Sequence, residues 1–383
     1  MKLSQVRRKL GRVDRAIEKA IARSEIPGAV VRARQGPESE GLSYEGVFGL
    51  SSVSPERCVT RPDTLYDLAS LTKVVATTPA ILLLVAQGRL ELDRPVADVL
   101  PAFGERGKEK ITVRHLLTHS SGLRPWRAYF DDLRERERRR GERLLATEAG
   151  REAIVSRILR SSPVHEAGAA SAYGDLGFIV LGELVAEVSG QRLDEFCQKQ
   201  IYAPLGLVHT HFNPVPFGGD PSRYAGSEQC EWREKILCGE VHDPNAWAMG
   251  GVAGHAGLFS TAGDLMRFAD EMLAADRGQS ELFPAVIAHE FFRRQGPESG
   301  AAPNSDWALG WDTPSDGRST SGRYFSPRSI GHVGFTGTSL WIDLEQQVSI
   351  VLLTSRQHLV AKRSQFSLRP LTHDLIREAF LAA

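Results

Sequence analysis

Ser70-Leu71-Thr72-Lys73 stands at the start of a long apolar run, which extends from Val74 to Gln87 and predicts a helix ending near Gly88. A serine three residues before a lysine at the start of a helix puts both side chains on one face, one turn apart. The helix N-terminus also offers unpaired N–H groups and a positive dipole end. A neighbouring amine can help to deprotonate such a serine, which then attacks a carbonyl carbon. Because S-x-x-K often arises by chance, a catalytic role needs support from other motifs.

Three further stretches carry residues suited to the same chemistry. Tyr173-Gly174-Asp175 precedes an apolar helix expected over residues 176–188. Residues 250–265 are a glycine-rich loop that runs into a helix. His332-Val333-Gly334 lies within residues 329–343, which are expected to form one strand whose glycines let another backbone or a substrate come close.

In order and spacing, these motifs resemble the S-x-x-K, Y-x-N and K/H-T-G elements of the penicillin-recognising serine hydrolases. This superfamily includes class C β-lactamases, D-Ala-D-Ala carboxypeptidases and the family VIII β-lactamase-like carboxylesterases. The resemblance runs from about Ile26 to the C-terminus, and residues 111–123 and 204–207 are also similar to the family. It implies an α/β (α+β) fold of the β-lactamase/transpeptidase type, in which an antiparallel sheet is flanked by helices and carries an inserted helical lobe.

The distribution of strand and helix patterns leads to the same architecture. Strands are expected near residues 28–34, 44–49, 337–343 and 348–354, with an amphipathic helix at the N-terminus and a last helix over 366–383. Strands at both ends of a chain with helices between them predict one sheet built from both termini. We therefore expect one catalytic unit over residues 1–383, with an α/β lobe (1–68 and 300–383) and a mostly helical lobe (69–299).

The composition narrows the possible partners. Lys and Arg total 47 and Asp and Glu total 47, so nothing indicates a nucleic-acid or membrane partner. Four cysteines are too sparse for a disulfide framework, and no signal-peptide core follows the basic N-terminus, so a cytoplasmic location is expected. The Arg-rich segment 134–143 predicts a solvated helix with ion pairs, or alternatively a mobile lid. No cofactor or metal is expected, and no oligomeric state is indicated.

The resemblance implies a role for each catalytic motif. Ser70 would be the nucleophile, and Lys73 would help to take its proton if burial and nearby charges hold the lysine pKa down. Tyr173 would pass the proton to the leaving group. The backbone N–H groups of Ser70 and Phe335 would form the oxyanion hole.

The substrate-binding strand is expected to carry His332 in place of the K-T-G lysine. This histidine could donate to a polar or anionic substrate group, but it carries a full charge only at mildly acid pH. Gly334 would take the place of the K-T-G glycine beside the substrate. An alternative register places Phe335-Thr336-Gly337 on K-T-G; His332 is preferred because it follows Gly331 and supplies a polar side chain.

Two positions depart from the family pattern. Asp175 stands where Asn is usual, and Val333 replaces the usual threonine, so donors that would hold a penicillin or a D-Ala-D-Ala peptide are lost. The resemblance places Asp175 close to Lys73. An ionised Asp175 would raise the lysine pKa and leave Tyr173 to take the serine proton, whereas a neutral Asp175 would donate in place of Asn.

The segment before the glycine-rich loop contains His242, Asn245 and Trp247, which are either turn residues or lining of the acyl or leaving-group pocket. By contrast, His115, His119 and His255 are expected to be structural. No G-x-S-x-G and no H-E-x-x-H occurs, which argues against an α/β-hydrolase and a zinc peptidase.

Four functions remain open. A carboxylesterase-type acyl hydrolase, acting on small esters or amides through a covalent acyl-enzyme, is favoured by Asp175, His332 and the absent signal peptide. A D-Ala-D-Ala carboxypeptidase or a class C-type β-lactamase, the latter disfavoured by the missing lysine, are alternatives. A non-catalytic binding protein on the same fold is a fourth possibility, but it would need no nucleophile–base pair.

Overall fold

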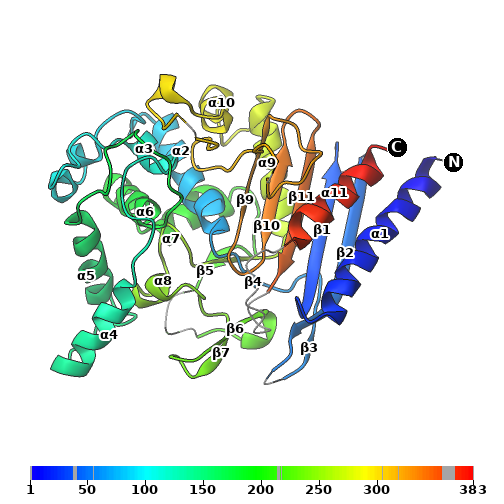
Figure 1. The fold of residues 1–383 in the computed structure, drawn as a ribbon, viewed down its shortest axis with the longest axis horizontal. Helices are drawn as coiled ribbons and strands as arrows, with labels where there is room; N and C mark the ends of the chain where they lie inside the picture. The colour runs from blue at the N-terminus through cyan, green and yellow to red at the C-terminus, as the bar shows by residue number, and fades with distance from the viewer. Residues whose placement is uncertain are drawn as a thin grey trace.

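A sheet assembled from both ends of the chain organises the molecule (Figure 1). The computed structural model describes residues 2–37, 41–54, 56–213, 216, 218–303, 305–317, 319–355 and 367–382. Within these residues the main sheet has six strands in the order β3-β2-β1-β11-β10-β9, all antiparallel to their neighbours. Its strands are β1 (Gly28–Gln35), β2 (Leu42–Ser52), β3 (Cys58–Val59), β9 (Ser329–Val333), β10 (Ser339–Asp343) and β11 (Val348–Thr354). The predicted sheet built from both termini is confirmed.

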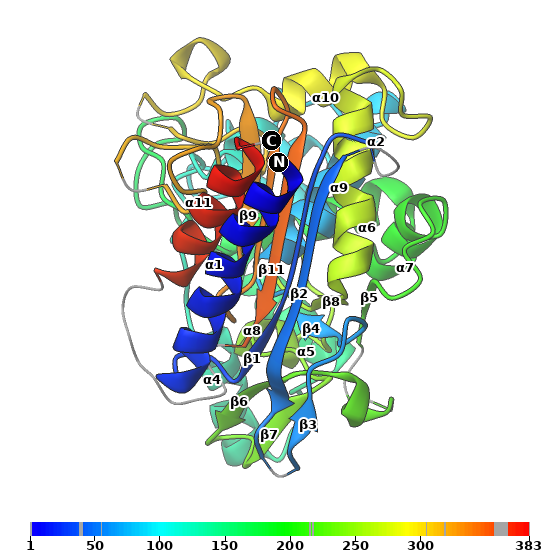
Figure 2. The ribbon, with the colours of Figure 1, turned by 90° about the vertical axis from the view of Figure 1, so that its right-hand side faces the viewer.

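The two faces of this sheet pack against different helices. Side chains alternate along a strand, so Val31 and Leu352 point to one face while Val30 and Val351 point to the other. The first face is covered by α1 (Lys2–Ala22) and α11 (Leu368–Phe380), which lie side by side, and the second by α9 (Ala262–Asp276) (Figure 2). The predicted N-terminal amphipathic helix is confirmed as α1; residues 366 and 383 of the predicted last helix lie outside the described residues.

The segment between the two halves of the sheet is rich in helices. They are α2 (Thr78–Ala86), α3 (Val113–Leu117), α4 (Tyr129–Arg140), α5 (Glu148–Leu159), α6 (Leu176–Ser189), α7 (Leu193–Cys197), α8 (Pro244–Ala248) and α10 (Ala285–Phe292). Smaller sheets join β4 (Tyr66–Asp67), β8 (Leu258–Ser260) and β5 (His211–Phe212), and β6 (Gly226–Cys230) with β7 (Lys235–Cys238). Helix α2 is apolar and buried over most of its surface, as expected of a helix inside a large core. The division into lobes at residues 69 and 299 stays a prediction.

Residues 329–343 do not form the single strand that the sequence predicted. They form β9 and β10, joined by a tight turn in which Gly334 N–H donates to Thr338 O at 2.8 Å. A side chain at Gly334 would lie 2.1 Å from Thr338 Oγ1 and 2.5 Å from Leu68 O, so only glycine fits this turn. The turn therefore stays close to the backbone that leads into Ser70.

The helix after Ser70 begins with an irregular turn. Lys73–Thr77 form a π-helical turn, η1, closed by a hydrogen bond from Thr78 N–H to Lys73 O, and α2 follows directly. Such single π turns are frequent at functional sites, because the extra residue redirects side chains along the helix. All five residues of η1 are buried.

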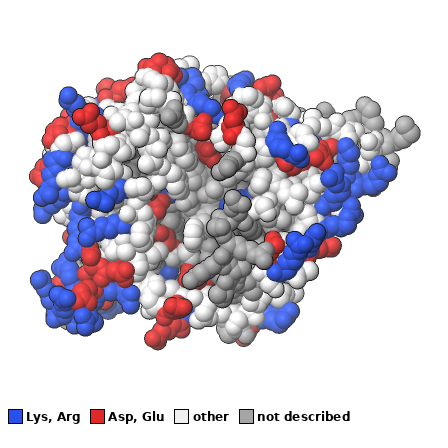
Figure 3. Space-filling model, in the orientation of Figure 1, with Lys and Arg blue, Asp and Glu red and all other residues white. Residues whose placement is uncertain are grey.

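The Arg-rich segment lies at the surface, mostly in α4. Arg134 pairs with Asp131, and Arg138 and Arg139 both pair with Glu135. Figure 3 shows Lys and Arg mixed with Asp and Glu where α4 lies in Figure 1, so the predicted solvated helix is confirmed. Across the described ranges, the helices lack the length and apolar character that crossing a membrane would require.

Candidate active site

A cavity of about 580 Å³ brings together most of the residues that the motifs predicted. It is enclosed by the start of the η1 helix, the segment before α6, the loop before β8, and β9 with its turn. The predicted residues that line it are Ser70, Tyr173, Asp175, His242, His332, Gly334 and Phe335. A second hollow of about 770 Å³, lined in part by Arg32, His209 and Asp264, contains none of the motif residues.

Ser70 follows a strained elbow in the backbone. Ala69 has φ of 46°, a left-handed conformation that a residue with a side chain seldom adopts. Asp67 supports the elbow, because its Oδ1 accepts from Ala69 N–H at 2.8 Å and its Oδ2 accepts from His242 N–H at 2.6 Å. Burial raises the pKa of Asp67, although the two N–H groups oppose the shift. The elbow presents Ser70 to the cavity.

Lys73 is the centre of the site. Its Nζ lies 3.0 Å from Ser70 Oγ, 3.0 Å from Tyr173 OH, 2.7 Å from Asp175 Oδ1 and 3.3 Å from His255 O. The side chain is fully buried, so these oxygens replace the water that an exposed ammonium would have. Serine, lysine and tyrosine, far apart in the sequence, thus meet around one nitrogen.

The protonation of Lys73 differs from that of a lysine base. Burial alone would lower the pKa of Lys73, but Asp175 and Tyr173 outweigh burial and raise the pKa above its ordinary value. The lowered pKa that a proton-accepting lysine requires is therefore not found. The charged pair of Lys73 with Asp175 corresponds to the first of the two states considered from the sequence, in which Asp175 is ionised.

Tyr173 is held in place by aromatic neighbours. Its ring stacks on Trp307 at a centroid distance of 5.5 Å and packs against His119 at 4.8 Å. His119 also binds the flanking backbone, since its carbonyl accepts from Ala172 N–H at 2.9 Å and its Nδ1 accepts from Gly174 N–H at 3.3 Å. Burial lowers the pKa of His119 well below its usual range, with the charge of Lys73 adding to the shift. A neutral His119 therefore packs against the Tyr173 ring and binds the backbone on both sides of this residue.

His332 lies on β9 and faces Tyr173 and Trp307 across the cavity wall. Burial, and then the charge of Lys73, lower the pKa of His332 to about 3. Its Nδ1 lies 2.9 Å from Val333 O, which can only accept, so Nδ1 carries the hydrogen and Nε2 is an acceptor. The prediction that His332 carries a full charge at mildly acid pH is wrong, because burial and the charge of Lys73 keep its imidazole neutral there.

The mouth of the cavity is formed in part by His242 and Phe335. Their rings lie 5.4 Å apart, and 55% of Phe335 is exposed. His242 also contacts the carboxylate of Glu228 through Nε2. Gly334, beside Phe335, lies in the turn that follows β9.

Asn245 and Trp247 do not line the cavity, so the prediction that they bind substrate is wrong and the alternative, a role outside the pocket, remains. Asn245 is fully buried; its Oδ1 accepts from Phe130 N–H at 3.1 Å and its Nδ2 donates to Arg127 O at 2.8 Å. Trp247 donates from Nε1 to Glu240 at 3.0 Å. Asn245 faces the start of α4 and the residues before it, and Trp247 faces the loop after β7.

Several residues that line the cavity were not predicted from the sequence. Trp126 and Trp307 lie in segments without a recognisable motif, and His255, which the sequence analysis expected to be structural, also lines the wall. The remaining missed residues include Asp243, Asp312 and Arg369. Burial raises the pKa of Asp312 to about 7.

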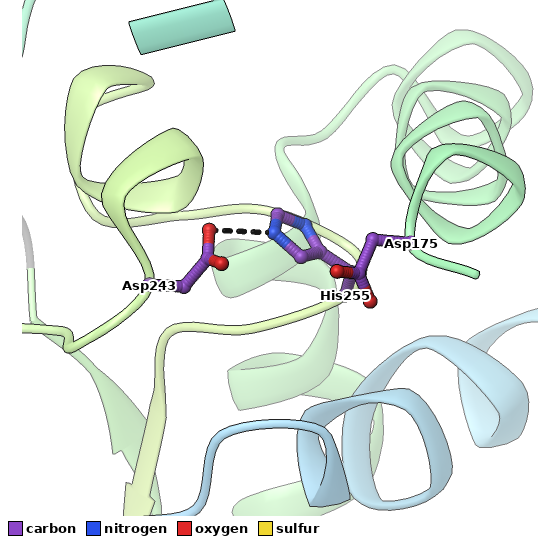
Figure 4. Close-up of side chains that lie close together, drawn as sticks. All are labelled: Asp175, Asp243 and His255. Atoms are coloured by element: carbon purple, nitrogen blue, oxygen red, sulfur yellow. Dashed lines mark hydrogen bonds and ion pairs between the residues drawn. The ribbon is translucent and has the colours of Figure 1, made fainter. Parts of the chain in front are cut away.

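Asp175, Asp243 and His255 lie close together, with ligand atoms all within 4.8 Å of one another (Figure 4). This spacing could suit a metal ion. However, the Lys73 ammonium already lies 2.7 Å from Asp175, and His255 Nε2 donates to Asp243 Oδ1 at 2.8 Å. Protein groups therefore satisfy these carboxylates without a metal ion.

The fold is shared with several solved structures. The octameric penicillin-binding protein homologue from Pyrococcus abyssi has a TM-score of 0.72 at 21% identity, covering 97% of this chain and 77% of that chain. EstCE1, a hydrolase with promiscuous acyltransferase activity, has a TM-score of 0.71 at 20% identity, covering 98% and 99%. The predicted β-lactamase/transpeptidase-like fold is confirmed.

Residues 13–369 match the beta-lactamase family, so the chain belongs to this family. It is 32% identical to the N-acetylmuramyl-L-alanine amidase of Bacillus subtilis strain 168, over 92% of this chain and 82% of the relative. It is 33% identical to an Escherichia coli K12 protein named "Putative D-alanyl-D-alanine carboxypeptidase", over 77% of this chain and 70% of the relative. The resemblance inferred from the motifs is confirmed, and the chain is a hydrolase of the β-lactamase and penicillin-binding-protein superfamily.

Proposed function

We propose that this protein is a serine acyl hydrolase that cleaves small esters or amides through a covalent acyl-enzyme at Ser70. The observation that carries the proposal is the position of Lys73 Nζ, 3.0 Å from both Ser70 Oγ and Tyr173 OH. A nucleophile that shares a buried ammonium with a second hydroxyl is suited to proton transfer along that path. A binding protein would have no use for this arrangement.

In the proposed mechanism Lys73 remains an ammonium throughout. Tyr173, as a phenolate paired with Lys73, takes the Ser70 proton while Ser70 Oγ attacks the carbonyl carbon. The N–H groups of Ser70 and Phe335 hold the oxyanion. Tyr173 then gives its proton to the leaving alcohol or amine, which departs and leaves the acyl-enzyme. Water repeats the sequence and releases the acid.

The walls of the cavity favour neutral substrates with an apolar part. Trp126, Tyr173, Trp307 and Phe335 supply aromatic surface, and the histidine at the K-T-G position is uncharged. The lysine and threonine that would hold a β-lactam carboxylate are absent. These features support a carboxylesterase-type activity above β-lactam hydrolysis.

An amidase is the second candidate. The relative from Bacillus subtilis named N-acetylmuramyl-L-alanine amidase matches 92% of this chain. Aromatic walls pack well against the apolar face of a sugar ring, so Trp126 and Trp307 are compatible with a muramyl substrate. Ester and amide cleavage would share the same acyl-enzyme chemistry.

Labelling with a fluorophosphonate tests the nucleophile. Intact-mass measurement should show one adduct on the wild-type protein and none on Ser70→Ala. Ser222→Ala removes an exposed serine and should label like the wild type. An adduct that persists on Ser70→Ala would refute the assignment.

A substrate panel distinguishes the two candidates. We expect short-chain p-nitrophenyl esters to be hydrolysed far faster than nitrocefin, because His332 and Val333 replace the lysine and threonine that would donate to a β-lactam carboxylate. N-acetylmuramyl-L-alanine and a D-Ala-D-Ala peptide complete the panel. Faster turnover of the muramyl amide than of any ester would establish the amidase, and comparable efficiency on nitrocefin would overturn both.

A further inference from the structure

Asp243 and His255, which have no assigned role in the proposed reaction, form a pair in the cavity wall in which His255 is buried and Asp243 is partly exposed. His255 Nε2 lies 2.8 Å from Asp243 Oδ1, and the His255 side chain is 1% exposed. Figure 4 shows the imidazole ring turned toward Asp243, with Asp175 beside the same histidine. The pair is therefore part of the surroundings of Lys73.

The loop that carries His255 binds the π turn directly. His255 O accepts from Lys73 Nζ at 3.3 Å, and Gly254 O accepts from Thr77 Oγ1 at 2.6 Å. The first and last residues of η1 are thus both held by one short loop. A side chain at Gly254 would lie 2.0 Å from Phe178 O, so the loop is wedged against α6 and has little room to shift. The position of this loop therefore helps to determine the position of Lys73 Nζ, which donates to His255 O.

Asp243 also places a carboxylate close to Asp175, the ion-pair partner of Lys73. Burial would raise the pKa of Asp243, but His255, the Ala246 N–H and His242 together outweigh burial and lower the pKa to about 2. A carboxylate can only accept, so the hydrogen of His255 Nε2 points to Asp243. Asp243 and Asp175 have oxygen atoms within 4.8 Å of each other, and the Lys73 ammonium lies next to Asp175.

We propose that Asp243 and His255 are positioning residues of this active site. Asp243 fixes the imidazole and its loop, the loop carbonyl holds Lys73, and the charge of Asp243 adds to that of Asp175 in keeping Lys73 protonated. The link to catalysis rests on the proposed function, but the effect on Lys73 does not depend on the substrate. The other titratable groups around the pair are Asp67, His119, Tyr173, His242, His332 and Arg369.

Asp243→Asn isolates the charge of the pair. Asp243 caps α8 by accepting from Ala246 N–H at 2.7 Å, and asparagine caps helices equally well. The amide oxygen can also accept from His255, so the geometry is kept. We expect kcat to fall about ten-fold with KM changed less than about two-fold, because Lys73 is held less well in the reacting geometry.

Measuring the pKa of Lys73 distinguishes an effect of the Asp243 charge from a purely structural effect of the substitution. In the wild type the lysine pKa is too high to follow, so the measurement is made with Asp175→Asn, which removes the nearest carboxylate. Carbon-13 NMR of ε-labelled lysine, with the signal assigned by Lys73→Met, then reports the midpoint. Adding Asp243→Asn should lower this midpoint by about one pH unit, because an attractive charge is lost.

Asp220→Asn serves as the matched control. Asp220 accepts from Ser222 N–H at the start of another short helical turn and is exposed, so the same chemical change there should leave the midpoint and kcat unaltered. His255→Gln can still donate to Asp243 and provides a second variant if Asp243→Asn does not fold. It should lower kcat while KM changes less than about two-fold, because the loop carbonyl that holds Lys73 is then placed less well.

An unchanged Lys73 midpoint in folded Asp175→Asn/Asp243→Asn would overturn the proposal. Equal loss of kcat in Asp220→Asn would overturn it as well. These outcomes are distinct from failure of the proposed function, in which Ser70 would not be labelled at all while the NMR midpoint would still shift.

Discussion

Lys73 determines how the proton can move in this site. Its ammonium is surrounded by the oxygens of Ser70, Tyr173, Asp175 and the backbone of His255. Because Asp175 and Tyr173 together outweigh burial, the pKa of Lys73 is raised and the lysine holds its proton at neutral pH. In the proposed mechanism Tyr173 then accepts the serine proton, and the charge on Lys73 stabilises the anion on either oxygen.

Asp175→Asn tests the charged pair. Without the carboxylate, burial becomes the dominant influence on Lys73 and lowers its pKa. The basic limb of the pH–rate profile for fluorophosphonate acylation should move down by at least about one pH unit, since an opposite charge in contact typically shifts a pKa by one to three units. Acylation by β-lactams should also rise, because an amide donor is restored.

Asp194→Asn is the control for this prediction. Asp194 pairs with Arg192 at the surface, so the same substitution there should not change the profile. A flat profile together with unchanged β-lactam acylation in Asp175→Asn would rule out the charged pair and return the role of base to Lys73.

The sequence located some site residues and not others for a physical reason. Ser70 and Lys73 are local neighbours on one helix, so spacing alone predicts that they meet. Asp243 and His255 are twelve residues apart and meet only because a loop folds back between α8 and β8. The side chain of Asn245 points elsewhere for the same reason: its direction is set by α8 packing, which no local pattern reveals.

The periodicity of apolar residues predicted the strands and the long helices, but it did not predict the turns that set their direction. The glycine at 334 reads in sequence as a flexible strand position. Its real constraint is the approach of Leu68 O from a distant part of the chain. The π turn of Lys73–Thr77 is likewise invisible in an apolar run, because α and π turns have almost the same pattern.

Gly334→Ala should disable the turn after β9. The added carbon would lie 2.1 Å from Thr338 Oγ1 and 2.5 Å from Leu68 O, so the turn must move away from the Ser70 elbow. We expect a loss of about 1–3 kcal/mol in the free energy of unfolding and at least a ten-fold slower acylation. Urea unfolding and fluorophosphonate kinetics measure these effects.

Gly218→Ala provides the comparison, since nothing lies within 4 Å of the added carbon there. Gly218→Ala should change neither the free energy of unfolding nor the rate of acylation appreciably. Wild-type acylation by Gly334→Ala would show that the turn does not position the site.

Asn245→Ala should weaken the connection between α8 and the segment before α4. Asn245 bonds the backbone of Arg127 and Phe130, next to Trp126 in the cavity wall. Two partly buried hydrogen bonds to the backbone would be lost, which costs about 1–3 kcal/mol of stability. Because Trp126 becomes less firmly held, KM should rise several-fold while kcat changes less.

Thr147→Ala gives a comparable loss without touching the cavity. Thr147 caps α5 by accepting from Gly150 N–H at 3.2 Å, and losing such a cap costs about 1 kcal/mol. Its KM should equal that of the wild type. An equal rise of KM in both variants would attribute the effect to general destabilisation.

On the scale of the whole molecule, buried ionisable groups link stability to pH. Burial lowers the pKa of His373 to about 4 and that of His332 to about 3, and it lowers the pKa of His119 as well. Below about pH 6.5 the unfolded chain binds protons on these histidines and the folded protein does not. Stability should therefore fall as the pH drops. Asp312, with a pKa raised to about 7, acts in the opposite direction over the same range.

His373→Gln should make the protein less sensitive to acid. His373 is fully buried between Ser339 and Ser321, so its contribution to the slope approaches about 1.4 kcal/mol per pH unit between about pH 6.5 and pH 4. Urea unfolding from pH 7 to pH 4 should show a smaller decline in the variant. His209→Gln, at a half-exposed position, should follow the wild type, and a wild-type slope in His373→Gln would contradict the assignment.

The pairing of β1 with β11 also affects how the chain folds while it is being made. Val31 pairs with Leu352, so translation delivers β1 and β2 long before their central partner has left the ribosome. Until then, β1 has an open edge that invites pairing with other chains. We expect stalled nascent chains ending before Ser329 to bind chaperones and to be cut readily by protease. Protection should arise only after Thr354 has emerged from the exit tunnel.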